Sequence, residues 1–228
     1  MIYVSSDWHG TSLDKVQALL KKAEFGPNDF LFVLGDVIDR GEHGIDLLKF
    51  IMYESNIQLI RGNHEQMLLS CSFLFDEINE ESVNELSMQK MKSLTLWQSN
   101  GGAATIDGLS KLPHSMRMGI VDFLEDTPFF DFVTVGDKKY LLVHAGINNY
   151  GFDASSEHDF LWTRPSLDTV YSSDFITVLG HTPTWFYGEE YKGKILNNGT
   201  WINVDVGAAG VIYPALLRLD DMKEFYLE

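Results

Sequence analysis

The chain has 228 residues, 45% of them hydrophobic and 22% charged, which is typical of a globular protein and excludes a disordered chain or a disulfide scaffold. Its 17 basic and 33 acidic residues give a net charge of −16, which disfavours duplex nucleic acid as a partner. The apolar runs fall far short of the ~20 residues that cross a bilayer, so no membrane partner is expected. The first residues lack the features of a secretory signal, and the lone Cys71 suits a reducing compartment, so we predict a cytoplasmic location.

In the first third of the chain, short apolar runs alternate with segments of helical periodicity. The apolar runs predict strands over Ile2–Ser5, Phe30–Leu34 and Ile57–Ile60. The periodic segments predict helices over Leu13–Ala23, Ile45–Tyr53 and Met67–Ile78. This alternation indicates a sheet with parallel pairing at its centre and helices on its faces.

The remainder of the chain is rich in strands after two further helices, predicted over Glu80–Lys92 and Met116–Leu124. Strands are predicted over Phe132–Val135, Tyr140–His144, Phe175–Leu179, Trp201–Val206, Ala215–Leu219 and Glu224–Leu227, with a hairpin arm over Lys194–Gly199. We therefore predict an α/β (α+β-like) fold with two packed mixed β-sheets, or one large mixed sheet, flanked by helices. No linker divides the sequence, so residues 1–228 are predicted to form a single domain, with 80–115 as a cap or specificity segment.

Five of the predicted strands are each followed directly by a polar cluster. Ligand sites in open α/β sheets form outside the carboxyl ends of the strands, so these five loops would meet at one edge if the strands lie side by side. The side chains that they would bring together are Asp7, His9, Asp36, Asp39, Asn63, His64, His144 and His181.

Such a gathering of carboxylates and imidazoles is unfavourable without cations, because like charges repel and shift each other's pKa. Nitrogen and oxygen ligands without a thiolate favour Mn²⁺, Fe or Zn²⁺. The set is too large for one four-coordinate ion, whereas two ions ~3.5–4 Å apart with a bridging carboxylate would use it fully. The sequence therefore predicts a site for two divalent metal ions.

Each motif taken alone also has a simpler explanation. Asp7-x-His9 could start a capped helix, Asn63-His64-Glu65 could cap another, and His144 could be a core histidine. Asp205-x-Gly207 is interpreted as a turn, and the aromatic cluster 185–187 as core packing rather than a substrate-stacking surface. The ordered set of five clusters, each after a strand, favours the metal site over these separate explanations.

The ordered motifs resemble the calcineurin-like metallophosphoesterase superfamily, over a span from Asp7 to His181. The motifs that carry the resemblance are Asp7-x-His9, Gly35-Asp36-x-x-Asp39-Arg40-Gly41, Gly62-Asn63-His64-Glu65, His144 and Gly180-His181. Three segments resemble more specifically its serine/threonine phosphoprotein phosphatase branch, of the compact bacterial and bacteriophage-lambda type: Asp39-Arg40-Gly41, Trp97-x-x-Asn100-Gly101-Gly102 and Leu161-Trp162-Thr163-Arg164. The resemblance implies the β-sandwich of that superfamily.

The resemblance also implies a role for each motif residue. Asp7 and His9 would hold the first metal, Asp36 would bridge both, and the second metal would be held by Asn63, His144 and His181. A water activated by the two ions would attack phosphorus. Arg40 and Arg164 would bind the substrate phosphate, and His64, oriented by Asp39, would protonate the leaving oxygen.

One motif departs from the pattern of many superfamily members, which end in Gly-His-x-His. Here the string is Gly180-His181-Thr182-Pro183, so the second histidine ligand is absent, as it is in the phosphoprotein phosphatase branch. The first metal would then have fewer protein ligands and weaker binding, and we expect Mn²⁺ rather than Fe or Zn²⁺.

Three functions are compatible with these motifs. The leading interpretation is a metal-dependent phosphomonoester hydrolase acting on phosphoserine and phosphothreonine, because two arginines suit a dianionic phosphate. The alternative is a dinucleoside-polyphosphate hydrolase or a cyclic-nucleotide phosphodiesterase, although bacterial dinucleoside tetraphosphatases usually carry a different residue at the position of Asp39. The third is a non-catalytic metal-binding or partner-binding module, in which His64 would have no evident use.

Overall fold

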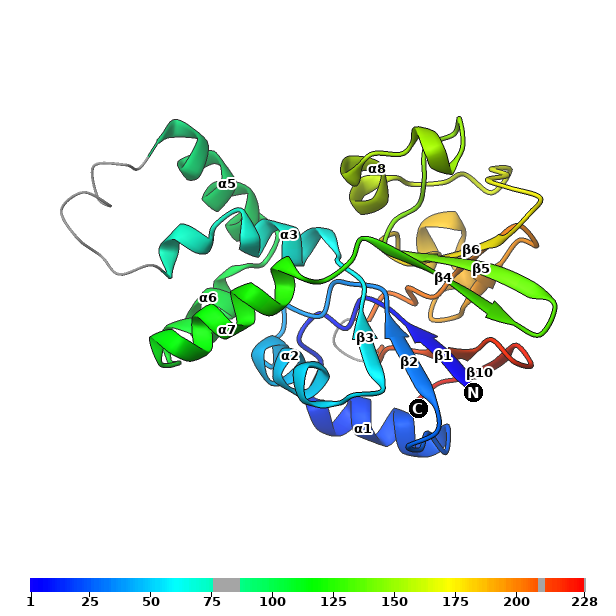
Figure 1. Ribbon diagram of the computed structural model, residues 1–228, viewed down its shortest axis with the longest axis horizontal. Coiled ribbons are helices and arrows are strands. Elements are labelled where there is room, and N and C mark those ends of the chain that lie inside the picture. Colours follow the sequence, from blue (N-terminus) through cyan, green and yellow to red (C-terminus); the bar gives the residue numbers. More distant parts are fainter. Residues whose placement is uncertain (76–86, 209–211, 228) are drawn as a thin grey trace.

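The computed structural model describes residues 1–75, 87–208 and 212–227. Two five-stranded mixed β-sheets lie face to face, with helices on their outer sides (Figure 1). The predicted α/β fold with two packed sheets is confirmed. None of the helices within these three ranges is both long and apolar enough to cross a bilayer.

The first sheet has the strand order β10-β9-β1-β2-β3. Its members are β1 (Ile2–Ser5), β2 (Phe30–Val33), β3 (Ile57–Leu59), β9 (Leu216–Arg218) and β10 (Lys223–Phe225). Strands β1, β2 and β3 are parallel, whereas β9 is antiparallel to both of its neighbours. The helices α1 (Leu13–Lys22) and α2 (Gly44–Tyr53) make the two crossovers between the parallel strands and cover the outer face (Figure 1).

The second sheet has the strand order β4-β5-β6-β8-β7. Its members are β4 (Phe130–Val135), β5 (Lys138–Val143), β6 (Ile176–Leu179), β7 (Leu196–Asn197) and β8 (Trp201–Asn203). The central strands β5, β6 and β8 are parallel, and each edge strand is antiparallel to its neighbour. The outer face packs against α8 (Glu157–Trp162) and the short 3₁₀ helices 152–154, 184–187 and 189–191.

The core between the sheets follows from the alternation of side chains along each strand. In β1, Val4 faces the second sheet while Tyr3 packs under the helices, and in β5 Leu142 faces the first sheet while Leu141 packs outward. The hydrophobic cluster of the inner layer contains Val4, Phe32, Leu34, Leu142, Val178, Ile202 and Leu217. The two parallel strand sets are thereby locked together, and their carboxyl ends meet at one edge.

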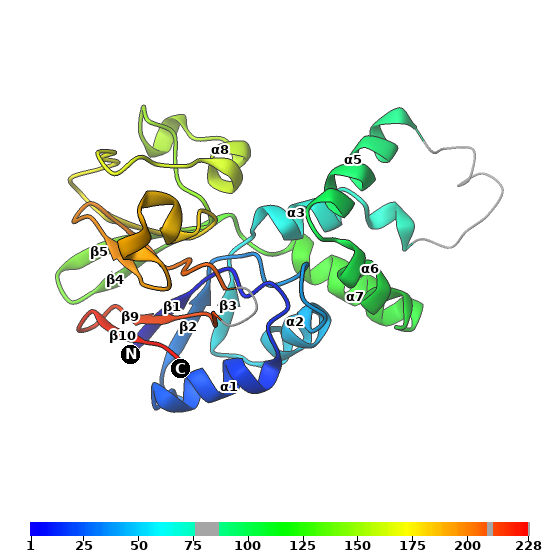
Figure 2. The ribbon, with the colours of Figure 1, turned by 180° about the vertical axis from the view of Figure 1, so that it is seen from behind.

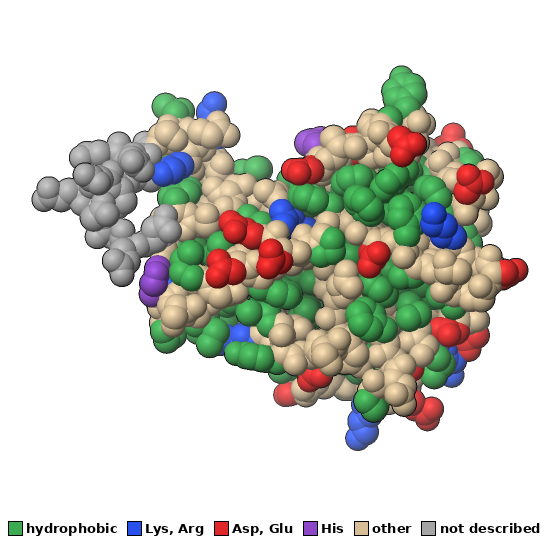
Figure 3. All heavy atoms as spheres, viewed as in Figure 1, with side chains coloured by type: hydrophobic (Ala, Val, Ile, Leu, Met, Phe, Trp, Pro, Cys, Tyr) green, Lys and Arg blue, Asp and Glu red, His purple; other side chains and the backbone are tan. Residues whose placement is uncertain are grey.

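Helices α3 (Asn63–Leu69), α5 (Met88–Ser99), α6 (Ala103–Ser110) and α7 (His114–Glu125) form an arm beside the sheets (Figures 1 and 2). Figure 3 shows acidic side chains scattered over this arm and over the loops of the sheets. Within the segment 80–115, residues 80–86 lie outside the described residues, and the remainder forms α5, α6, the turns that follow them and the start of α7. That this segment shapes specificity stays a prediction, as does the single domain over 1–228.

The structure corrects several element boundaries. The helix predicted over Met67–Ile78 instead begins at Asn63 and ends at Leu69, followed by the 3₁₀ helix Ser72–Leu74. It begins early because Glu65 accepts hydrogen bonds that fix its first turn. The helix predicted over Glu80–Lys92 is described only from Met88 onward and continues to Ser99, and the helices α6 and α8 were not predicted.

Candidate functional site

The loops that follow β1, β2, β3, β5 and β6 converge where the two sheets meet. Backbone hydrogen bonds tie neighbouring loops together, from the N–H of Asp7 to the carbonyl of Gly35 (3.0 Å) and from the N–H of Gly180 to the carbonyl of His144 (2.7 Å). The eight side chains that the sequence placed at this edge are all buried and clustered: Asp7, His9, Asp36, Asp39, Asn63, His64, His144 and His181. The cluster draws on both sheets.

Asp36 lies at the centre of the cluster and is shared by two groups of candidate metal ligands. His9 and His64 form one group with it, and His144 and His181 form the other, with all ligand atoms of a group within 4.8 Å of one another. The Oδ2 of Asp36 is 3.8 Å from His9 Nε2, and its Oδ1 is 3.4 Å from His144 Nε2. One carboxylate therefore faces both groups with different oxygens, as a bridging ligand would.

The second group directs several lone pairs at one point. His144 donates its Nδ1–H to the carbonyl of Leu34 (2.6 Å), so its Nε2 carries a lone pair. That Nε2 lies 2.8 Å from the Oδ1 of Asn63 and 3.2 Å from the Nδ1 of His181. The buried Nε2 of His181 has no hydrogen-bond partner among the described residues. Facing acceptors of this kind repel each other, and a divalent cation between them resolves the repulsion.

The first group shows the same pattern. The Nδ1 of His9 lies 3.2 Å from the carbonyl of Ile38, to which it donates, so its Nε2 lone pair points at Asp7 Oδ1 (3.7 Å) and Asp36 Oδ2 (3.8 Å). The other carboxylate oxygen of Asp7 accepts from the backbone N–H of His181 (2.9 Å) and from the hydroxyl of Ser6. The residues present therefore fit a second cation at this position.

The burial of these groups disfavours their charged forms. Burial and the nearby Asp7 carboxylate raise the pKa of Asp36 well above its usual value. Burial lowers the pKa of His9 to about 3 and also lowers the pKa of His181. A bound cation would shift Asp36 back towards its charged carboxylate form and would keep the imidazoles neutral.

His64 and Asp39 form a hydrogen-bonded pair beside the metal ligands. The Nδ1 of His64 lies 2.6 Å from Asp39 Oδ2, which also accepts from the indole N–H of Trp97 (2.8 Å). Burial lowers the pKa of His64 to about 3 and raises that of Asp39 to about 6. At neutral pH the imidazole therefore donates its Nδ1–H to the Asp39 carboxylate, and its Nε2 faces the site, 3.4 Å from an Arg40 nitrogen.

Backbone strain is concentrated at this site. Among the described residues, eight non-glycine residues have φ between +40° and +68°, and six of these are predicted site residues: Asp7, His9, Asp36, Asp39, Arg40 and His181. A positive φ is costly for such residues and is maintained only where the surroundings fix it. The short turns are thus held in the one conformation that points their side chains inward.

Sequence reasoning missed Glu65, which holds the Asp36 loop in place. Its buried carboxylate accepts hydrogen bonds from the backbone N–H groups of Asp36 (2.8 Å), Val37 (2.9 Å) and Gly62 (3.0 Å). Gly62 is required here because a Cβ would overlap the Asp36 carboxylate. The available signal was the acidic residue at the third position of a helix, where a side chain commonly reaches back to the first backbone N–H.

Asp205 does more than the predicted turn. Its Oδ1 accepts from the N–H of Gly207 (2.8 Å), as a turn residue would. Its carboxyl group is also fully buried, and burial together with the nearby Asp7 raises its pKa well above the usual value.

The prediction that the aromatic cluster 185–187 packs in the core is wrong at two positions, because Trp185 and Phe186 are 47% and 61% exposed.

The two predicted phosphate-binding arginines lie at the mouth of the cluster and are exposed. The backbone N–H of Arg40 donates to the carbonyl of Gly101 (3.1 Å), in the turn between α5 and α6. Arg164 donates to the hydroxyl of Thr182 (2.9 Å), the neighbour of His181. One guanidinium therefore comes from each sheet, and both border the buried ligands.

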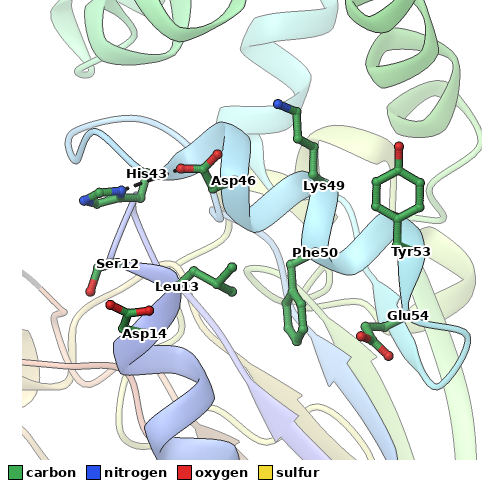
Figure 4. A pocket seen from close by; sticks show the side chains of 9 residues that line it. All are labelled: Ser12, Leu13, Asp14, His43, Asp46, Lys49, Phe50, Tyr53 and Glu54. Carbon is green, nitrogen blue, oxygen red and sulfur yellow. Dashed lines mark ion pairs between the residues drawn. The ribbon is translucent and has the colours of Figure 1, made fainter.

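A separate hollow of about 520 Å³ lies between the start of α1 and α2 (Figure 4). It contains an exposed pair, His43 and Asp46, with 3.7 Å between the Nδ1 and a carboxylate oxygen. Its lining includes three acidic side chains and none of the predicted site residues. The converging loops, and not this hollow, therefore form the candidate site.

Comparisons with known proteins point to one family. A profile of the calcineurin-like phosphoesterase family matches residues 1–208. The symmetrical bis(5′-nucleosyl)-tetraphosphatase of Haemophilus ducreyi is 40% identical over 70 residues, which are 30% of this chain and 26% of that protein. The enzyme of the same name from an Enterobacter species is 37% identical over 70 residues, 30% of this chain and 24% of its own length. The chain thus matches about a quarter of the length of these relatives.

Solved structures share the fold at low sequence identity. The crystal structure of a candidate diadenosine tetraphosphatase aligns with 99% of this chain and 92% of its own, with a TM-score of 0.65 and 14% identity. A cold-active protein tyrosine phosphatase aligns with 95% of this chain and 72% of its own, with a TM-score of 0.57 and 19% identity. At these identities the likeness shows the shared fold alone.

Proposed function

Because the chain belongs to the calcineurin-like phosphoesterase family and is a metallophosphoesterase, we propose that it hydrolyses dinucleoside polyphosphates at the converging loops described above. The observation that carries the site is the single Asp36 carboxylate shared by two groups of metal ligands. The substrate class is supported by the identity of 37–40% with two symmetrical tetraphosphatases over 70 residues.

In this proposal two divalent cations would bind on either side of Asp36. Asp7, His9 and Asp36 would hold the first, with His64 of that group kept free for proton transfer, and Asp36, Asn63, His144 and His181 would hold the second. The donors are nitrogen and oxygen atoms only, which suits Mn²⁺. Bound there, the ions would supply Lewis-acid activation of a water and of the phosphate oxygens.

The remaining residues bind the phosphate and move a proton. The guanidinium groups of Arg40 and Arg164 border the ligands from opposite sheets, so both can contact one phosphate. His64 Nε2 faces the same space and, once it has taken up a proton, would deliver that proton to the leaving oxygen, while Asp39 orients the ring through the 2.6 Å contact. The contact between Arg40 and Gly101 connects the 80–115 segment to the substrate phosphate.

A serine/threonine protein phosphatase is the second candidate. It is favoured by the pairing of two arginines with His64 and Asp39, since a terminal dianionic phosphate benefits from two guanidinium groups. The reacting phosphate of a dinucleoside polyphosphate is internal and carries less charge. The site itself therefore permits both substrates, and the sequence identity with the tetraphosphatases favours the dinucleotide.

A panel of four substrates assayed with Mn²⁺ tests the proposal: diadenosine tetraphosphate, a phosphoserine peptide, p-nitrophenyl phosphate and a 2′,3′-cyclic nucleotide. We expect the highest kcat/KM for diadenosine tetraphosphate. A higher value for the phosphopeptide would favour the protein phosphatase, and a higher value for the cyclic nucleotide would favour a phosphodiesterase. The His43→Asn variant, at an exposed residue outside the site, serves as a control and should match the wild type. If the protein with two bound ions hydrolyses none of the four substrates, the proposal that it is a phosphoesterase is refuted.

A further inference from the structure

A second hollow opens directly beside the metal ligands. Its volume is about 480 Å³, within the range of small-molecule sites. His9, Arg40 and Gly41 form one end of its lining, next to the candidate site, and Lys15 and Tyr213 also line it. A substrate with its reacting phosphate at Arg40 therefore has space to extend into this hollow.

The lining of the hollow suits an anion. Lys15 extends from α1, and its ammonium lies 4.6 Å from the centroid of the Tyr213 ring, a cation–π contact that restricts the side chain. No carboxylate of the described residues lies within ion-pair distance of Lys15. The hydroxyls of Thr11 and Ser12 form no hydrogen bond with the described part of the chain and remain available as donors.

The neighbouring hollow provides a direct contrast. Ser12 borders both, but the hollow between α1 and α2 is lined by Asp14, Asp46 and Glu54 with a single lysine, Lys49 (Figure 4). The described lining of the Lys15 hollow contains no acidic residue. In a chain of net charge −16, a described lining with a lysine, an arginine and no acidic residue repels a polyanion less than the neighbouring acidic hollow does.

We propose that the hollow lined by Arg40 and Lys15 binds the phosphates of a nucleoside polyphosphate that are not themselves hydrolysed, with Lys15 as the residue that selects such substrates over simple monoesters. The inference rests on the proposed hydrolysis of dinucleoside polyphosphates and adds the place where their non-reacting phosphates bind. Arg40 borders both the metal ligands and the hollow, and Lys15 lines the same hollow, so in this proposal one polyphosphate chain contacts both residues. A monoester with an apolar leaving group has no phosphate for Lys15 to contact.

The test compares Lys15→Gln with Lys49→Gln, the matched change in the neighbouring acidic hollow. For Lys15→Gln we expect the KM for diadenosine tetraphosphate to rise about 10-fold with kcat within about 2-fold, and kcat/KM for p-nitrophenyl phosphate to stay unchanged. The Lys49→Gln variant should match the wild type on both substrates. The Lys15→Arg variant keeps the positive charge, so its KM for diadenosine tetraphosphate should stay close to that of the wild type. A uniform loss on both substrates, or no change in KM, would overturn the role of Lys15.

Equilibrium binding of ADP, measured by calorimetry with Mn²⁺ present, keeps this test separate from the proposed function. We expect Lys15→Gln to weaken ADP about 10-fold while leaving the affinity for inorganic phosphate unchanged. If the wild-type protein hydrolyses p-nitrophenyl phosphate but not diadenosine tetraphosphate, the dinucleotide substrate is refuted. The ADP measurement would still show whether the hollow binds phosphates. Equal ADP affinity in the wild type and in Lys15→Gln would refute phosphate binding by Lys15 in the hollow, whatever the substrate panel shows.

Discussion

The two sheets contribute different chemistry to one site. The loops of the first sheet carry the carboxylates, the His64–Asp39 pair and most of the strained turns, with positive φ at Asp7, His9, Asp36, Asp39 and Arg40. The loops of the second sheet supply two imidazoles and Arg164, with positive φ at His181 alone among these residues. The first sheet thus holds a preformed half-site, and packing of the second sheet against it completes the ligand groups.

The largest expected effect comes from Asp36→Asn, because this residue belongs to the first sheet and faces the imidazoles of both. Loss of its charge removes the carboxylate that the two ligand groups share. We expect metal content to fall for both ions together and kcat/KM to drop by about 10³-fold, as a metal contributes several kcal/mol to the transition state. Plasma mass spectrometry of the purified variant measures this, and two retained ions would contradict the shared ligand.

His64→Asn tests whether the first sheet also supplies the proton donor. The variant removes Nε2 from the site but leaves all proposed ligands in place. We expect kcat to fall by about 10²–10⁴-fold with metal content unchanged. An unchanged kcat would remove His64 from the acid role, and a loss of metal would make it a ligand instead.

Glu65→Gln tests how far the half-site depends on its buried clamp. The amide would turn an N–H donor towards backbone N–H groups that now bond to the carboxylate of Glu65. We expect the free energy of unfolding to fall by about 1–3 kcal/mol. Urea denaturation measures the loss, and Glu157→Gln, an exposed residue at the start of α8 on the second sheet, is the control that should leave stability unchanged.

The smallest effect is expected at the far edge of the first sheet, for Asp221→Asn. Two hydrogen bonds from Arg218 (2.8 and 2.6 Å) lower the pKa of Asp221 to about 2 from an ordinary value of 3.8. Because the folded pKa is the lower one, its stabilisation is complete above pH 3.8 and is lost as the pH falls through 2. Urea midpoints should differ slightly at pH 7 and converge near pH 2, with activity unchanged; a change in kcat would show coupling to the site.

The local pattern of apolar and polar residues in the sequence was enough to predict most strands of both sheets, because apolar runs mark segments that are buried between layers. It was not enough for α3, whose first turn is fixed by the Glu65 carboxylate. This carboxylate accepts from the N–H of Gly62 and from the N–H groups of Val37 and Asp36, 28 and 29 residues away. It also failed for Trp185 and Phe186, because hydrophobicity alone does not say that a short 3₁₀ helix leaves them exposed.

The sequence by itself determined most of the strands, the alternation of strands and helices in the first third of the chain, and the polar residues that follow five of the strands, since hydrophobic periodicity and turn chemistry are local properties. Only the tertiary structure decided which atoms meet. The N–H of His181 reaches Asp7 across 174 residues, and the indole of Trp97 reaches Asp39 across 58. Such contacts depend on how the two sheets and the helical arm pack, and packing is set by side chains distributed over the whole chain.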